Sequence, residues 1–216
     1  SLKLLRKQEY RGHLYVLIAI FIYFIGYTGI EAQFTTYAVE HLGMEESTAG
    51  LTLGFFSLSF VLFAIPAGII GTKLGKVPVM LIGLILLPII FILVPLLPLL
   101  SNLSPILNGI LILQLTLFIG GISWAFVNVQ AYPLVADLGG KQRIGFFTGL
   151  YYLFSMSSAI IAPGMLGLLM DIFDPSALFY GASTSFIIAL FFLRKGYKVL
   201  KNSSVTIIDD EKNQKM

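Results

Sequence analysis

The feature that constrains this chain most is a run of 60 residues, 77–136, without a single aspartate, glutamate, lysine or arginine. Soluble domains carry about 25% charged residues, whereas this chain carries 12%. Helices can place such a run in hydrocarbon because they satisfy their own backbone hydrogen bonds. Strands of outer-membrane barrels alternate apolar and polar residues over roughly ten positions, and the apolar runs here do not alternate. The sequence therefore predicts an all-α integral membrane protein.

Six apolar segments are long enough to cross a hydrocarbon core of about 30 Å. Short turns rich in glycine, proline, serine or charged residues separate them, as expected between antiparallel neighbouring helices. We expect six transmembrane helices near 14–38, 47–71, 77–99, 106–135, 144–170 and 176–193.

Basic residues are confined to alternate connections. All 14 lysines and arginines lie before the first span, in the second and fourth connections, or after the last span. The other connections hold only acidic charges, namely Glu40, Glu45, Glu46, Asp171 and Asp174. Loops rich in lysine and arginine stay in the cytoplasm. We therefore predict a multi-pass protein of the plasma or inner membrane with both termini cytoplasmic.

The charge pattern also divides the chain into three parts. We expect a cytoplasmic linker at 1–13, a six-helix transmembrane domain at 14–193 and a cytoplasmic tail at 194–216. Because the chain begins with serine and a basic segment, we expect further residues upstream of it.

The second connection resembles a known signature loop. The segment AIPAGIIGTKLGKVPVML (64–81) is similar to the G-x-x-x-D-R-x-G-R-K loop of the major facilitator superfamily. Thr72 and Val77 depart from that pattern, as is familiar in the copy carried by the second half of the family. The matching positions are Gly68, Lys73, Gly75 and Lys76.

The fourth connection extends the resemblance. Residues 132–155, together with GISWAFVN (121–128), are similar to the region around the tenth and eleventh helices of sugar-transporting branches, including glycoside and sucrose symporters. The resemblance implies two inverted three-helix repeats, about 14–99 and 106–193. It also implies that this chain is a carboxy-terminal half, that an amino-terminal six-helix half is missing, and that substrate lies between the halves.

Small residues and prolines inside the spans bear on packing. Glycines spaced four apart share one helix face and allow close helix contact in lipid. Prolines inside a span kink or loosen the helix, either as gating points or simply to shape packing. The glycine pairs are Gly50 and Gly54, Gly71 and Gly75, and Gly145 and Gly149; the prolines are Pro66, Pro88 and Pro163.

Glu31 is an ionisable residue well inside a span. A carboxylate near the bilayer centre costs about 2.5–3.5 kcal/mol on insertion scales, so it normally faces water or a partner. Helical spacing places it on a stripe with Thr28 and Thr35, beside Tyr27. One hypothesis is that Glu31 binds a sugar hydroxyl or carries a coupling proton. The alternative is that it reaches the outer surface, since it lies roughly 25 Å from Leu14 along the helix.

Polar and aromatic residues on two other spans are further candidates. Trp124 and Asn128 share one helix face, where a ring and an amide could bind a sugar; the alternative is that both pack between helices. In the fifth span, Tyr151 or Tyr152 and Ser155 belong to a polar stripe. We predict that these residues contribute to a substrate site or hold helices together.

A charge cluster is expected in the fourth connection. Asp137 lies near Lys141 and Arg143 in the sequence. These charges could form a cytoplasmic gate that breaks and re-forms during alternating access. The alternative is that Asp137 is a solvated acid that caps a turn.

Other functional classes are disfavoured. The chain has no cysteine, and its two histidines, His13 and His41, lie at opposite membrane surfaces. No activated serine or metal cluster is therefore expected, so the chain is not predicted to be an enzyme or to hold a metal or cofactor. The basic stretches suit anionic lipid at the bilayer surface, and no nucleic-acid surface is predicted.

These features favour secondary active transport of a small solute by alternating access. By resemblance the solute is a sugar or glycoside, taken up by symport, with a proton or cation as coupling partner if Glu31 carries it. Two alternatives remain open, namely a non-transporting scaffold or assembly subunit, and a transporter of a non-sugar metabolite or drug.

Overall fold

The computed structural model describes residues 10–97 and 109–213, without the side chains of Lys141 and residues 203–213. Within the described residues, six helical segments are long and apolar enough to cross a membrane. The regular elements of that part of the chain are all helical. The predicted all-α membrane fold with six spans is therefore confirmed. Most of the predicted linker, residues 1–9, lies outside the described residues.

The helices extend beyond the predicted spans at most of their ends. They are α1 (Arg11–Glu40), α2 (Glu46–Leu74), α3 (Lys76–Leu93) with the 3-10 turn η3 (Val94–Leu96), α5 (Gly109–Ile172) and α6 (Ala177–Asn213). Helix α5 contains two spans, which we call the first arm (Gly109–Gly140) and the second arm (Gln142–Ile172). The spanning part of α6 ends at Asn202. The segment predicted as a tail from 194 therefore begins as a continuation of α6. The predicted span ends at 98–99 and 106–108 lie outside the described residues.

Two glycines reverse the chain at the tight turns. Gly75, between α2 and α3, has a φ of 92°, and Gly140, between the two arms of α5, has a φ of 56°. Only glycine adopts positive φ without a steric cost from Cβ. Gly140 and Arg143 have non-helical backbone angles, and this break separates the two arms. Both turns fall where the sequence predicts them.

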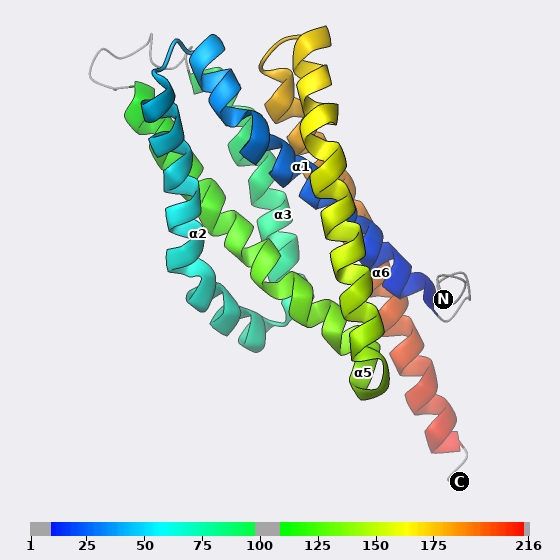
Figure 1. Cartoon of the computed structure of the whole chain (residues 1–216). Coiled ribbons are helices and arrows are strands. Elements are labelled where there is room, and N and C mark those ends of the chain that lie inside the picture. Colours follow the sequence, from blue (N-terminus) through cyan, green and yellow to red (C-terminus); the bar gives the residue numbers. More distant parts are fainter. Residues whose placement is uncertain (1–9, 98–108, 214–216) are drawn as a thin grey trace.

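The spans form an antiparallel bundle (Figure 1). The start of α1, the end of α6, the α2–α3 turn and the turn between the arms of α5 lie toward one end of it. The connections after α1 and after the second arm lie at the other end. Each of the first three spans therefore runs in the direction opposite to that of the corresponding span among the last three, as inverted repeats require. That the first end faces the cytoplasm stays a prediction.

The bundle is packed unevenly. Helix α1 packs mainly against α6 and α5, and α3 packs against α5 and α6. Stacked rings join these elements: Phe91 of α3 lies 5.8 Å from Phe186 and 6.2 Å from Phe179 of α6, between ring centroids. Helix α2 and the second arm are far less buried than the other spans. Each of them leaves one side without a neighbour among the described residues.

Close helix crossings use glycines that the sequence did not single out. A Cβ at Gly121 would lie 2.1 Å from the Phe56 carbonyl oxygen, and a Cβ at Gly83 would lie 2.6 Å from the Ser123 carbonyl oxygen. The backbone of the first arm therefore comes close to the backbones of both α2 and α3, which small residues permit.

The predicted role of the glycine pairs is wrong for two of the three pairs within this chain. A Cβ at Gly50, Gly54, Gly145 or Gly149 would meet no atom within 4 Å. These four glycines lie on the open sides of α2 and the second arm, so equal spacing does not show which face of a helix is occupied. In the third pair, Gly71 packs against Gln130, whereas Gly75 forms the turn.

Candidate functional site

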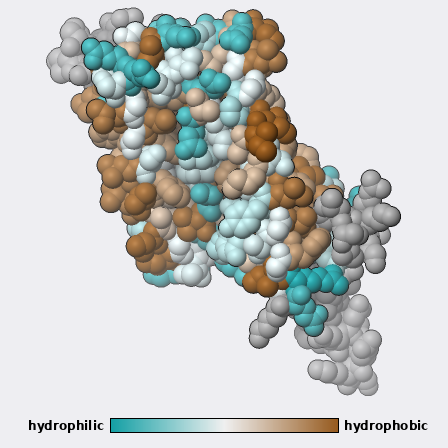
Figure 2. All heavy atoms as spheres, viewed as in Figure 1, coloured by the Kyte–Doolittle hydropathy of each residue, from teal (hydrophilic) through white to brown (hydrophobic). Residues whose placement is uncertain are grey.

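The face seen in Figures 1 and 2 lies between α2 and the second arm, with α1 and the first arm crossing between them. Hydrophilic and weakly hydrophobic residues form a band down the middle of this face, and strongly hydrophobic residues flank it (Figure 2). Polar atoms inside a membrane domain normally face water or protein, because exposure to hydrocarbon is costly. This band is therefore the candidate functional site.

Aromatic rings link α1 to the first arm. The Tyr27 and Trp124 rings stack nearly parallel, with centroids 4.0 Å apart and an interplanar angle of 10°. Tyr23 and Phe24 pack edge-on against the same indole, each with centroids 5.6 Å apart. Trp124 is only 1% exposed. The indole is therefore packed between helices in this conformation, which matches the packing alternative of the sequence analysis.

Tyr27 covers Trp124 and is itself only half-buried. Its other neighbours are Phe24, at 6.4 Å, and Phe56 of α2, at 5.9 Å, between ring centroids. Of the stacked pair, Tyr27 is thus the ring that is accessible on this side. A role for either ring in binding stays a prediction.

Glu31 lies one turn after Tyr27, and its side chain is exposed. The carboxylate interacts electrostatically with the Tyr27 hydroxyl. Both residues border a small recess that Leu53, Phe56 and Ser57 of α2 complete. Because α1 continues to Glu40, Glu31 lies about 14 Å from its end, at 1.5 Å per residue.

Three tyrosines form a second aromatic cluster, on the two arms of α5. The Tyr132 centroid lies 5.6 Å from that of Tyr151 and 6.4 Å from that of Tyr152, and the last two are 5.3 Å apart. Phe24 connects this cluster to the first, at 6.5 Å from Tyr151. Tyr132 and Tyr152 are exposed, whereas Tyr151 is nearly buried.

Sequence reasoning named Tyr151 and Tyr152 but missed Tyr132. A usable signal existed, because Trp124, Asn128 and Tyr132 are each four residues apart and so share one face of the first arm. Asn128 is half-buried on that face. The structure thus brings Tyr27, Trp124, Tyr151 and Tyr152 into one connected set of rings.

The serine stripe of the second arm points into the protein. Ser155 is buried, and its hydroxyl donates to the Tyr152 carbonyl at 3.4 Å. The Ser158 hydroxyl donates to the carbonyls of Phe154 and Ser155, at 3.1 and 2.6 Å. Both hydroxyls are therefore bonded to their own helix, and Ser155 is buried whereas Tyr152 is exposed.

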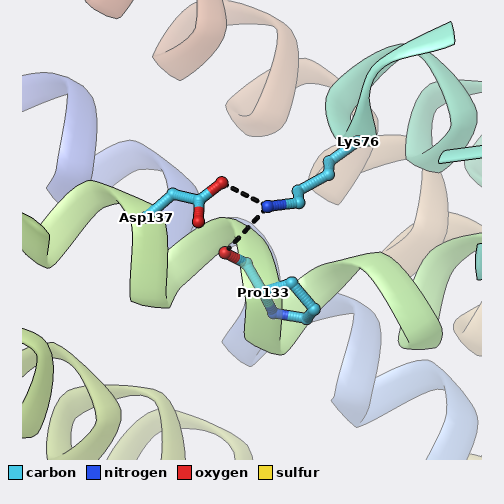
Figure 3. Close-up of polar contacts among 3 residues, drawn as sticks. All are labelled: Lys76, Pro133 and Asp137. Carbon is cyan, nitrogen blue, oxygen red and sulfur yellow. Dashed lines mark hydrogen bonds and ion pairs between the residues drawn. The ribbon is translucent and has the colours of Figure 1, made fainter. Parts of the chain in front are cut away.

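An ion pair joins the two turns that carry the signature-like sequences. Lys76, at the start of α3, pairs with Asp137 near the end of the first arm (Figure 3). The same ammonium also contacts the Pro133 carbonyl oxygen at 3.4 Å. The Lys76 side chain is 28% exposed and that of Asp137 is 66% exposed, so solvent screens the pair.

The expected cluster of Asp137 with Arg143 is therefore wrong in its partners. Arg143 donates to the Tyr10 hydroxyl and lies over the Tyr10 ring at 5.6 Å. The backbone break at Gly140 lies between Asp137 and Arg143, and Arg143 contacts Tyr10, directly before α1. The Lys141 side chain lies outside the described part of the chain.

The other signature positions have simple structural roles. Lys73 is exposed in the last turn of α2, where a cation favours the helix dipole. Gly75 supplies the turn. A Cβ at Gly68 would meet Val129 at 3.7 Å, an ordinary contact. Among the described residues, no three histidine, cysteine or acidic side chains are grouped to hold a metal.

The structure thus has six spans, two short glycine turns and an aromatic–polar face, and comparison with known proteins identifies the family. A comparison with curated proteins finds no match. The family model described as Major Facilitator Superfamily matches residues 16–206, which include all six spans almost completely. The match supports a multi-pass protein of a transporter family. By its sequence, this chain belongs to the major facilitator superfamily.

Proposed function

We propose that this chain is the carboxy-terminal half of a secondary transporter that moves a sugar or glycoside by alternating access. The observation that carries the proposal is the aromatic–polar face. It presents Tyr27, Glu31, Tyr132 and Tyr152 between two helices that have few neighbours in this chain.

The sparse packing of α2 and the second arm supports a partner half. Four glycines on these helices meet nothing within 4 Å, and small residues on an open helix side allow a second helix to approach closely. An amino-terminal six-helix half seated there would enclose the band between two domains. Such an enclosed interface is where secondary transporters hold substrate.

The chemistry of the band suits a sugar. Sugars have apolar faces that rest on aromatic rings and polar rims that need hydrogen-bonding groups. Tyr27, Tyr132 and Tyr152 provide accessible rings and hydroxyls, and the Glu31 carboxylate can accept hydrogen bonds from sugar hydroxyls.

Glu31 is also the proposed coupling group. A carboxylate inside the span can bind a proton when the site opens to one side and release it when the site opens to the other. Glu31 borders the same recess as Tyr27, so it would bind the proton beside a ring at the proposed substrate site. We place both termini and the Lys76–Asp137 pair on the cytoplasmic side of the plasma or inner membrane.

The ion pair is proposed to hold the inner end of this half together. Lys76 and Asp137 belong to the same domain, so rigid-body rocking against another half does not separate them. This differs from a gate whose charges break and re-form in each cycle.

Uptake of a panel of labelled sugars by the complete transporter tests the proposal. We expect one sugar or glycoside to accumulate in vesicles and a proton gradient to drive it. Glu31→Gln should abolish accumulation against a gradient, and Glu40→Gln, at the exposed end of the same helix, should leave it unchanged. Unchanged accumulation by both Glu31→Gln and Glu31→Ala would remove the role of Glu31, and uptake by this chain alone would refute the half-transporter.

A further inference from the structure

Two glutamines inside the bundle make equivalent contacts at opposite ends of the domain. Gln33 of α1 donates from Nε2 to the Pro163 carbonyl oxygen of the second arm, at 2.9 Å. Gln130 of the first arm donates from Nε2 to the Ala67 carbonyl oxygen of α2, at 2.7 Å. Each bond joins a helix that carries candidate site residues to a helix that flanks the site.

A glycine one turn farther along makes room for each amide. A Cβ at Gly167, four residues after Pro163, would lie 2.7 Å from Gln33 Nε2. A Cβ at Gly71, four residues after Ala67, would lie 2.1 Å from Gln130 Oε1. Any side chain there would displace the amide, so both glycines are needed for the crossings rather than for flexibility.

The two crossings occupy matching positions in the two sets of three helices. Gln33 and Gln130 are 97 positions apart in the sequence, and the acceptors Ala67 and Pro163 are 96 apart. The glycines are 96 apart as well. The same arrangement of a glutamine, an accepting residue and a glycine is therefore present twice, and the two copies are separated by nearly the same number of residues at all three positions. Because the second three spans run in the opposite directions (Figure 1), the copies lie toward opposite ends of the bundle.

Each acceptor helix is weakened next to the crossing. Pro163 itself supplies one accepting carbonyl, and Pro66 directly precedes the other. A proline removes a backbone hydrogen bond and pushes away the carbonyl one turn earlier, which loosens the helix. A glutamine amide that is removed from water needs a partner, and here its bond pins the flanking helix at the loosened point.

We propose that Gln33 and Gln130 are a symmetry-related pair of positioning residues, each of which pins a flanking helix at its proline to a helix of the site. Gln33 fixes the second arm toward the end opposite the termini. Gln130 fixes α2 toward the end with the termini. In a transporter, an assumption that rests on the proposed function, loss of Gln33 should favour opening at the end opposite the termini. Loss of Gln130 should favour opening at the end with the termini.

Hydrogen–deuterium exchange of the chain in lipid nanodiscs tests the pins without reference to transport. Gln33→Met and Gln130→Met keep side-chain length and remove the donor. We expect exchange to rise roughly threefold to tenfold in the second arm around Gly167 for the first variant, and in α2 around Gly71 for the second. Gln114→Met is the matched control, because that amide bonds the Thr52 hydroxyl at 3.4 Å and not a backbone carbonyl.

Glycine variants give an independent route to the same result. Gly167→Ala and Gly71→Ala leave each glutamine in place but put a Cβ where its amide lies. They should reproduce the exchange pattern of the corresponding methionine variants. Unchanged exchange in both acceptor helices, or equal loosening of both by either glutamine variant, would overturn the proposal. Should Gln130→Met not fold, the Gln33 and Gly167 variants decide the outcome by themselves.

The transport consequence has a separate readout. The chain has no cysteine, so a single cysteine can be placed toward either end of its α1. In a complete transporter whose other half also lacks cysteine, the reaction of this cysteine with a membrane-impermeant thiol reagent reports which end is open to water. Gln33→Met and Gln130→Met should shift accessibility in opposite directions. If both variants shift accessibility in the same direction, the positioning role in transport is contradicted. If hydrogen exchange changes as expected but the complete protein transports nothing, only the proposed function is refuted.

Discussion

Two pairs of helices, α3 with α6 and α2 with the second arm, are all apolar enough to cross a membrane, yet the two pairs are buried to different extents. In the most apolar windows of α3 and α6, 56% and 44% of residues are buried, against 17% for α2 and 22% for the second arm. In a bilayer, leucine and valine face lipid as readily as protein. Apolar content therefore identifies a span but does not show which side of it has a neighbour.

The glycines separate the two pairs of helices more clearly. Gly83 of α3 and Gly181 of α6 would each place a Cβ within 3.0 Å of another helix. Gly54 of α2 and Gly149 of the second arm would place it in open space. The packed helices thus use these glycines within this chain. The sparse helices do so only in part: Gly71 and Gly167 pack against glutamines, whereas Gly54 and Gly149 face a side that no described residue covers.

The largest expected effect on stability comes from comparing a packed ring with an accessible ring at the site. Trp124→Ala should lower the free energy of unfolding by about 3–5 kcal/mol, because the indole loses contact with three rings. Tyr152→Ala, at a ring that is 50% exposed, should change it by less than about 0.5 kcal/mol and lower sugar uptake instead. Unfolding titrations in mixed micelles measure the first quantity, and vesicle uptake measures the second.

A different result for Trp124→Ala and Tyr152→Ala would also identify which part of the comparison is wrong. Equal destabilisation by both would mean that Tyr152 is covered in the folded protein, which would remove it from the accessible band. Trp124→Phe is the control, since it keeps a ring at the position and should lose less stability than Trp124→Ala does.

The second prediction compares a packed glycine with an open one. Gly121→Leu should destabilise the chain by about 1–3 kcal/mol or more, because its Cβ would lie 2.1 Å from a backbone oxygen of α2. Gly54→Leu, on α2 itself, should leave stability within about 0.5 kcal/mol of the original. Thermal unfolding of the two variants in the same detergent gives the comparison, and a reversed order would show that α2 packs on its other side.

The sequence was sufficient for the features that depend on solvent and chain direction. Six spans, the short turns and the grouping of the basic turns at one end follow from the length of apolar runs and the placement of charge. The break at Gly140 also fell where a glycine-rich segment predicted it. These features are local, so no knowledge of which helix lies beside which is needed.

Contacts between helices were much less predictable. Spacing showed that Trp124 and Asn128 share a face but not that Tyr27 covers the indole. Asp137 was expected beside Arg143, six residues later in the sequence, yet its ion-pair partner Lys76 comes from another helix. Gln130 is not among the predicted site residues, and its contact with Ala67 depends on a glycine 59 positions away in the sequence.

The third prediction tests whether the open glycines serve a partner half. Gly54→Leu together with Gly149→Leu should leave the stability of this chain unchanged, because both Cβ positions are open. In the complete transporter the same double variant should weaken packing between the halves and reduce uptake on the order of tenfold, a free-energy change of about 1.4 kcal/mol. Uptake with equal protein at the membrane measures this effect. Unchanged uptake would place lipid, and not a second half, against these helices.

The smallest expected effect is at the Lys76–Asp137 pair, which ties the turn after the sparse helix α2 to the packed first arm. Asp137→Asn should cost about 0.2–1 kcal/mol, since 66% of the carboxylate side chain is exposed and salt screens the charge. The double exchange Lys76→Asp with Asp137→Lys should recover part of that loss. Unfolding at low and high salt measures both. If Asp137→Asn costs nothing measurable at either salt concentration, the contact of Lys76 with the Pro133 carbonyl holds the turn instead, and the link between sparse and packed helices is a backbone contact and not an ion pair.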